Sequence, residues 1–256
     1  DSDCYIVNPP GPLSQIPTLK RQMVHKLSGL VSDRSLGVGP VPSNEQMLNL
    51  SPSIAELHKL YDDLVARWPA GCGLELTALR HGQTATNQLA ILEGVVRGED
   101  GVLYDTALSD QGLEQARQAG AKLRGRAYDL AIASGLSRSH VTLELLLAGG
   151  QIDYATSGIC RDWRLNERHF GSLVGESFAP DQMKKEVKEA VRTFWGEAPG
   201  LEPYALIHCK ILWFLLDVFE AAIDFYKQIG KAMRAILITH IGILREYRAI
   251  LEELED

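Results

Sequence analysis

Three short apolar segments of the sequence each lead into residues that can bind an anion. Arg80 and His81 follow the first, Arg138 follows the second, and His240 follows the third. An arginine presents planar, paired donors to phosphate oxygens, and a neutral imidazole can attack phosphorus while a second one stabilises the transferring oxygens. If the three segments are parallel strands, these side chains meet at one edge of a sheet. The sequence therefore predicts a pocket there for an anion of roughly two charges.

Each of these features alone is weak evidence for a catalytic site, because a histidine at a strand end is more often structural and an Arg-His-Gly triplet can occur by chance. Their occurrence at three strand ends favours a common site. The other histidines have no such context and are interpreted as structural; they are His25, His58, His140, His169 and His208.

The segments that carry these residues have the length and composition of buried strands, at residues 74–79, 129–134 and 235–239. Helical periodicity follows each of them, and the last helix is expected over Leu244–Leu254. This alternation predicts an α/β fold with three layers, in which helices cover both faces of a mainly parallel sheet.

The sequence before this pattern is different in character. Residues 1–72 are expected to be an N-terminal extension with a linker, Gly37–Asn44, a helical candidate around Ile16–Leu30, and a helix over about Ser53–Trp68. Residues 73–256 are expected to form the catalytic domain.

Composition excludes several classes of function. The 256 residues are 45% hydrophobic with a net charge of -7, which suits a folded core and argues against nucleic-acid binding through a basic surface. Four scattered cysteines in no metal-binding spacing indicate free thiols and no metal site. The apolar stretch 204–223 is interrupted by charges, so it is expected to be a core or partner-facing helix rather than a membrane span. Because the chain begins at Asp1, we expect either a cytoplasmic protein or a mitochondrial or other organellar one whose targeting peptide has been removed.

Five stretches in order resemble the signature of the histidine phosphatase superfamily, and most closely its cofactor-dependent phosphoglycerate mutase branch. The resemblance covers about residues 74–251, and the fourth stretch carries the narrower assignment. The stretches are LRHGQTATN at 79–87, LSDQGLEQARQAGAKL at 108–123, ASGLSRSHVT at 133–142, DWRLNERHFGSLVGES at 162–177 and ILITHIGILR at 236–245.

The resemblance implies a role for each matching residue and a phosphoglycerate mutase-like fold. His81 would be the phosphorylated nucleophile and Glu167 the general acid and base. The transferring phosphoryl group would be bound by Arg80, Arg138 and His240, and the substrate would be contacted by Asn87, Arg168, Arg192 and Gly82. No metal or resident cofactor is required, although a mutase would need 2,3-bisphosphoglycerate as a primer.

The sequence also departs from the mutase pattern. The usual His-Gly-Asn is His240-Ile241-Gly242, which puts a β-branched side chain close to the expected phosphate. Phe178 occupies the place of a substrate-binding lysine, and Val191 replaces one arginine of a pair. The remaining departures are Phe170 in place of a tyrosine, a shortened insert at about Gly196–Tyr204, and a longer loop, Asn87–Ser109, that contains Glu93, Arg97, Glu99 and Asp100.

Two hypotheses follow. The first is an enzyme that transfers a phosphoryl group through phosphohistidine on a small phosphorylated metabolite, either as a phosphoglycerate mutase or as a phosphomonoesterase. The second is an impaired pseudoenzyme that serves as a structural subunit of a larger assembly, with residues 1–72 and the 204–226 helix facing a protein partner. A homo-oligomer is compatible with both.

Overall fold

The computed structural model describes residues 4–7, 54–93, 96–97, 103–154, 158–192 and 198–253. Its main sheet has the strand order β1-β2-β9-β6-β8. β1 is antiparallel to β2, and the other neighbours are parallel, as the strand–helix alternation predicts. The bounds are β1 Cys4–Val7, β2 Leu74–Arg80, β6 Leu130–Ser134, β8 Cys160–Asp162 and β9 Met233–Thr239.

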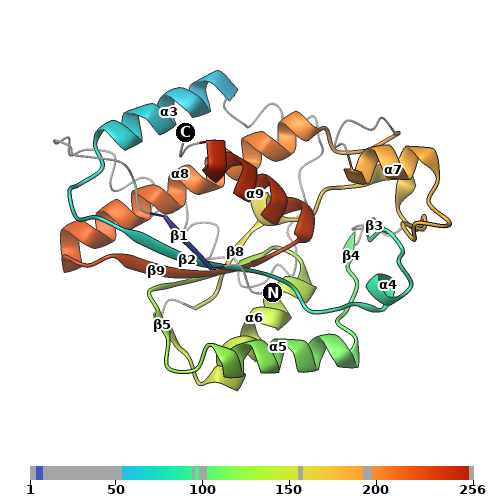
Figure 1. Cartoon of the computed structure of the whole chain (residues 1–256), viewed down its shortest axis with the longest axis horizontal. Coiled ribbons are helices and arrows are strands. Elements are labelled where there is room, and N and C mark those ends of the chain that lie inside the picture. The colour runs from blue at the N-terminus through green and yellow to red at the C-terminus, as the bar shows by residue number, and fades with distance from the viewer. Residues whose placement is uncertain are drawn as a thin grey trace.

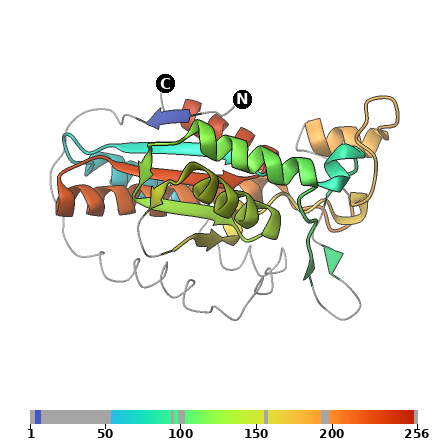
Figure 2. The ribbon, with the colours of Figure 1, turned by 90° about the horizontal axis from the view of Figure 1, so that it is seen from below.

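Helices cover both faces of this sheet, which confirms the three-layer α/β/α prediction (Figures 1 and 2). One face carries α3 Ile54–Ala66, α8 Tyr204–Ile229 and α9 Ile241–Glu253. The other carries α5 Asp110–Lys122 and α6 Ser137–Gly150. Helix α9 begins at Ile241 and not at Leu244 as predicted, so it starts directly after His240.

Smaller elements gather at the end of the sheet to which β2 runs (Figures 1 and 2). They are the helices α4 Ala85–Gln88 and α7 Lys185–Arg192, and the paired strands β3 Val96–Arg97 and β4 Leu103–Tyr104. The remaining elements are β5 Ala127–Tyr128, β7 Asp153–Tyr154 and the 3-10 turns η1 Trp163–Leu165 and η2 Gly171–Leu173.

The strand register decides where the chemical groups lie. β2 and β9 are parallel neighbours with Arg80 opposite Thr239. The residues that follow, His81 and His240, are therefore side by side at the carboxyl edge of the sheet. The strand interiors are apolar and buried between the two helical layers, which fixes this edge on a rigid core.

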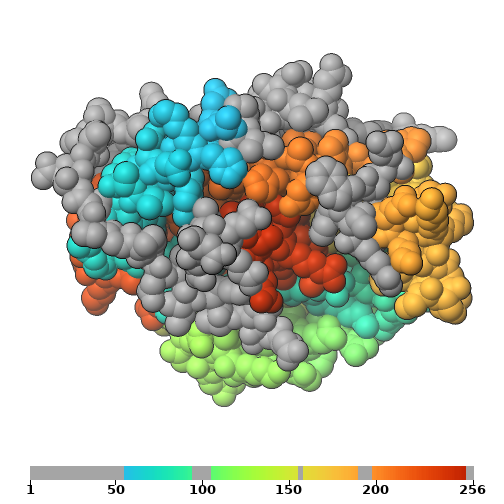
Figure 3. Space-filling view, turned by 45° about the horizontal axis from the view of Figure 1, so that its top comes forward, coloured from blue at the N-terminus to red at the C-terminus, as the bar shows by residue number. Residues whose placement is uncertain are grey.

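Helix α3 packs on α8 within the main core. The surface atoms of α3, in blue and cyan, lie next to those of α8, in orange (Figure 3). The rings of Trp68 and Phe219 pack edge to face with their centroids 5.7 Å apart, and Arg67 forms an ion pair with Glu220. The apolar composition of α8 therefore reflects burial within this chain. None of the described helices is long and apolar enough to cross a membrane. The predicted helix Ile16–Leu30 and linker Gly37–Asn44 lie outside the described residues.

Candidate active site

His81 has the geometry of a nucleophile. Its backbone N–H donates to the Thr239 carbonyl at 3.0 Å, and its Nδ1 lies 2.7 Å from the Gly82 carbonyl oxygen. Because a carbonyl only accepts hydrogen bonds, Nδ1 carries the proton and Nε2 keeps its lone pair. Burial, and next the charge of Arg138, lower the pKa of His81 to about 3. The ring is therefore neutral near pH 7, with Nε2 ready to attack.

His240 lies beside it, with ring centroids 4.9 Å apart. Its Nδ1 is 3.4 Å from Nη2 of Arg138, and its Nε2 is 2.8 Å from the Ser134 hydroxyl. A guanidinium only donates, so Nδ1 is the acceptor and the proton is on Nε2. Burial lowers the pKa of this wholly buried histidine well below its usual value, with Arg138 as the next cause.

The two arginines predicted to hold the phosphoryl group differ in their surroundings. Arg80 is exposed and donates from Nη2 to Oδ1 of Asn87 at 3.1 Å. Asn87 in turn belongs to a capping box with Thr84 at the start of α4. Arg138, in the first turn of α6, is only 1% exposed.

Two carboxylates that sequence reasoning did not place in the site contact Arg138. Asp105 accepts from its Nη1, and Oε2 of Glu93 lies 3.5 Å from its Nε. The length of the Asn87–Ser109 loop was the available signal, because both residues belong to it. The consequences of these contacts are taken up below.

Glu167 faces the same cluster. Its Oε1 accepts the backbone N–H of Arg168 at 3.0 Å. Burial raises the pKa of Glu167, while that hydrogen bond and the charges of Arg138, Lys210 and Arg80 oppose the rise. A carboxyl group whose protonated form is favoured suits a proton donor. Burial thus produces this effect in the free protein, without a bound phosphate.

The His-Ile-Gly departure has a structural explanation. A Cβ at position 242 would lie 2.6 Å from Oε1 of Glu167, so Gly242 leaves room for that carboxylate. The Ile241 side chain is 41% exposed, and the neighbouring His81 and His240 rings remain in contact with each other. We find no sign that Ile241 displaces either ring.

Gly82 has a packing role. A Cβ there would come within 2.5 Å of the Gly112 carbonyl oxygen, and the Gly82 N–H already donates to the Thr142 hydroxyl at 3.0 Å. The glycine therefore allows α5 to approach the chain directly after His81. Its contact with substrate stays a prediction.

The other predicted substrate ligands lie further along the chain. Arg168 is buried and donates from Nε to the main-chain oxygen of Glu202 at 2.9 Å. Arg192 is the last residue of α7, and its side chain lies outside the described part of the structure. Substrate contacts of both arginines stay predictions.

An apolar cluster, which we call the apolar wall, begins next to these groups. Leu92 precedes Glu93, and Phe170 closely follows Glu167. The members of the apolar wall are Leu92, Phe170, Leu173, Phe178, Met183, Val187, Ala198 and Leu201.

A buried ion pair behind the site was also missed from the sequence. Lys210 of α8 is 3% exposed, and its Nζ lies 2.8 Å from Oε1 of Glu202 and 3.2 Å from the carbonyl oxygen of Asn166. The pair therefore joins α8 to the segment that carries Glu167. The hint of a buried ion pair in the sequence was the position of Lys210 within an apolar stretch.

Among the described residues, no group of three or more His, Cys, Asp and Glu side chains is arranged to hold a metal ion. The thiols of Cys72, Cys160 and Cys209 are free.

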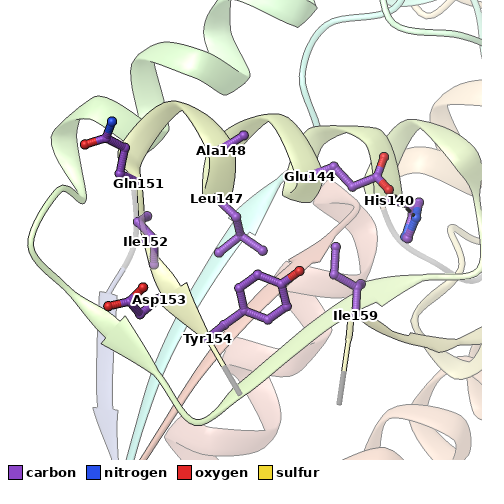
Figure 4. A pocket seen from close by; sticks show the side chains of 9 residues that line it. All are labelled: His140, Glu144, Leu147, Ala148, Gln151, Ile152, Asp153, Tyr154 and Ile159. Carbon is purple, nitrogen blue, oxygen red and sulfur yellow. Dashed lines mark ion pairs between the residues drawn. The ribbon is translucent and has the colours of Figure 1, made fainter. Parts of the chain in front are cut away.

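A separate pocket of about 560 Å³ opens beside α6 (Figure 4), and neither His81 nor His240 lines it. None of the predicted site residues lines it. Its lining is His140, Glu144, Leu147, Ala148, Gln151, Ile152, Asp153, Tyr154 and Ile159.

The fold and this strand-edge site are those of the histidine phosphatase superfamily. The sequence profile of the histidine phosphatase superfamily (branch 1) matches residues 76–255, and the chain belongs to that family. A 2,3-bisphosphoglycerate-dependent phosphoglycerate mutase of Staphylococcus epidermidis is 34% identical over 125 residues. That match covers 48% of this chain and 46% of the mutase, so it spans about half of the length of the relative.

Solved structures support the fold. A putative alpha-ribazole-5'-P phosphatase of Escherichia coli has a TM-score of 0.51 at 21% identity, covering 70% of this chain and 82% of its own. A mycobacterial glucosyl-3-phosphoglycerate phosphatase has a TM-score of 0.52 at 24% identity, covering 68% and 76% respectively. At these identities the likeness concerns the fold alone.

Proposed function

We propose that this protein is a phosphomonoesterase that works through a phosphohistidine on His81. The observation that carries the proposal is the arrangement of His81, which is neutral, has Nε2 unprotonated, and lies beside His240. Membership of the histidine phosphatase superfamily supports the same chemistry.

In the first step, Nε2 of His81 forms a bond to phosphorus as the bond to the ester oxygen breaks. Arg80 and Arg138 bind the phosphoryl oxygens, and Glu167 gives its proton to the leaving alkoxide. His240 lies beside the ring of His81 and accepts a hydrogen bond from Arg138. Phosphoryl transfer depends mainly on such positioning and charge stabilisation.

In the second step, a water molecule attacks phosphorus and the bond to Nε2 breaks. The Glu167 carboxylate accepts the proton of this water, which releases inorganic phosphate and restores both residues. A protonated Glu167 is needed at the start of the first step, and the pKa raised by burial favours that form.

The acceptor is proposed to be water rather than phosphoglycerate. Phe178 and Val191 occupy the positions at which the mutase resemblance implies cations for a second anionic end. Phe178 is a partly buried member of the apolar wall. A mutase primed by 2,3-bisphosphoglycerate is the alternative within the same chemistry.

The test is to trap the intermediate. Protein is incubated with [³²P]2,3-bisphosphoglycerate and with a labelled simple phosphomonoester, and then quenched in alkali, in which phosphohistidine survives. Label should appear on wild type and be absent from His81→Ala. Release of phosphate without interconversion of 2- and 3-phosphoglycerate supports the phosphatase, and interconversion supports the mutase. An unlabelled, folded wild type would overturn both and favour the scaffold hypothesis.

A further inference from the structure

The carboxylate of Glu93 lies against the arginine expected to bind the phosphoryl group. Its Oε2 is 3.5 Å from Nε of Arg138, and its Oε1 accepts from the hydroxyls of Thr84 and Thr86. The side chain is only 7% exposed. These contacts hold the carboxylate in one position, and water screens its charge only weakly.

The backbone around Glu93 explains why it points to Arg138. Residues 90–92 run beside residues 175–178, with hydrogen bonds from the N–H of Phe178 to Ala90 at 2.7 Å and from the N–H of Leu92 to Glu176 at 2.9 Å. In an extended segment, neighbouring side chains point to opposite sides. Leu92 accordingly joins the apolar wall, while Glu93 is directed to the reacting groups.

The charges around the phosphoryl site therefore nearly cancel in the free protein. Arg80 and Arg138 contribute two positive charges, while Glu93 and Asp105, both in contact with Arg138, contribute two negative charges. The nearby Lys210 is paired with Glu202. A phosphoryl group still gains directed hydrogen bonds from the arginines. Arg168 adds a further cation, but its charge lies near the carboxyl groups of Glu202 and Glu167 and its Nε donates to the main-chain oxygen of Glu202. The positive charge left for a second anionic group of the substrate is therefore small.

We propose that Glu93 determines specificity, by selecting phosphomonoesters whose alcohol part is uncharged or cationic and rejecting those that carry a carboxylate or a second phosphate. This proposal rests on the proposed function. Arg138 contacts Glu93 and is expected to bind the phosphoryl group as well. The alcohol part of a small substrate must therefore lie close to the negative charge of Glu93.

A pair of substrates isolates this effect. sn-Glycerol 3-phosphate and 3-phosphoglycerate differ mainly in a terminal CH₂OH against a carboxylate. Wild type should have the higher kcat/KM for glycerol phosphate. Glu93→Gln keeps the shape and the hydroxyl contacts while removing the charge, and should shift the ratio about tenfold toward 3-phosphoglycerate. The matched control is Glu176→Gln, which removes an equal charge from the neighbouring segment, where Glu176 forms an exposed pair with Lys184. It should change the ratio less than about twofold.

Three outcomes would overturn the proposal: a wild type that prefers 3-phosphoglycerate, an unchanged ratio in folded Glu93→Gln, or an equal shift in Glu176→Gln. If Glu93→Gln does not fold, the wild-type preference between the two esters still decides. Equilibrium binding of both esters to His81→Ala, with and without Glu93→Gln, measures the same discrimination without turnover. A failure of phosphohistidine chemistry is thereby distinguished from a failure of the role of Glu93.

Discussion

The reaction centre and the apolar wall beside it are stabilised in opposite ways. The reaction centre consists of His81, Arg138, Glu167 and His240, whose polar atoms are held by hydrogen bonds and ion pairs. The apolar wall has main-chain pairing at its edge and hydrophobic contacts within. Charge placed in a buried site is expensive to move, whereas apolar side chains can be exchanged at small cost. Substitutions in the reaction centre should therefore be costly, and conservative substitutions in the apolar wall should be tolerated.

The largest difference in activity between a variant of the reaction centre and a variant of the apolar wall is expected when the proton donor Glu167 is replaced. Glu167→Gln should lower turnover of an alkyl phosphate by roughly 10²–10⁴-fold, because the alkoxide then leaves unprotonated. With p-nitrophenyl phosphate, whose leaving group needs no proton, the loss in the first step should be much smaller.

The measurement is pre-steady-state release of nitrophenol compared with steady-state alkyl phosphate hydrolysis. Leu92→Met in the apolar wall is the control and should preserve both rates. Equal losses on the two substrates in Glu167→Gln would show that Glu167 does not act as the acid.

The buried ion pair under the reaction centre should matter more for stability than the exposed pair near the apolar wall. Lys210→Met leaves Glu202 buried without its partner and should lower the free energy of unfolding by about 3–5 kcal/mol. Lys184→Met, at the exposed pair, should cost less than about 1 kcal/mol.

Urea titration measures both values. Adding Glu202→Gln to Lys210→Met should recover part of the loss, because the uncompensated charge is removed. If both lysine variants cost the same, the contrast between a buried and an exposed pair would be wrong.

Acid should destabilise the protein because the buried His81 side chain resists protonation in the folded state. The pKa of His81 falls from 6.5 to about 3 on folding, so below pH 6.5 the unfolded chain binds a proton that the folded protein does not. Stability therefore falls as the pH decreases toward 3, and the contribution of His81 between pH 6.5 and 4.5 is about 2 kcal/mol.

Unfolding free energies measured across this range should fall less steeply for His81→Asn than for wild type. His58→Asn, on the exposed side of α3, is the control and should follow the wild-type slope. Parallel curves for wild type and His81→Asn would contradict the neutral, buried state of His81.

That His81 and His240 lie together could be predicted from the sequence, whereas the contacts around them could not. Strand ends are visible locally, and parallel pairing then brings His81 and His240 together without further information. The contacts of Glu93 and Lys210 depend on how a loop and a helix pack across the fold, for which the sequence has no periodic signal. Likewise, the reason for Gly242 is the approach of Glu167, which is remote in sequence.

The smallest effect is expected from restoring a cation at the apolar wall. Phe178→Lys puts back the charge that the mutase resemblance implies, and should raise kcat/KM for 3-phosphoglycerate relative to glycerol phosphate by about fivefold or less. The gain is limited because Glu93 remains and because position 178 is partly buried among apolar side chains. Phe178→Leu is the control and should leave the ratio unchanged. A larger gain from Phe178→Lys than from Glu93→Gln would mean that the missing cation, and not the buried carboxylate, sets the selectivity.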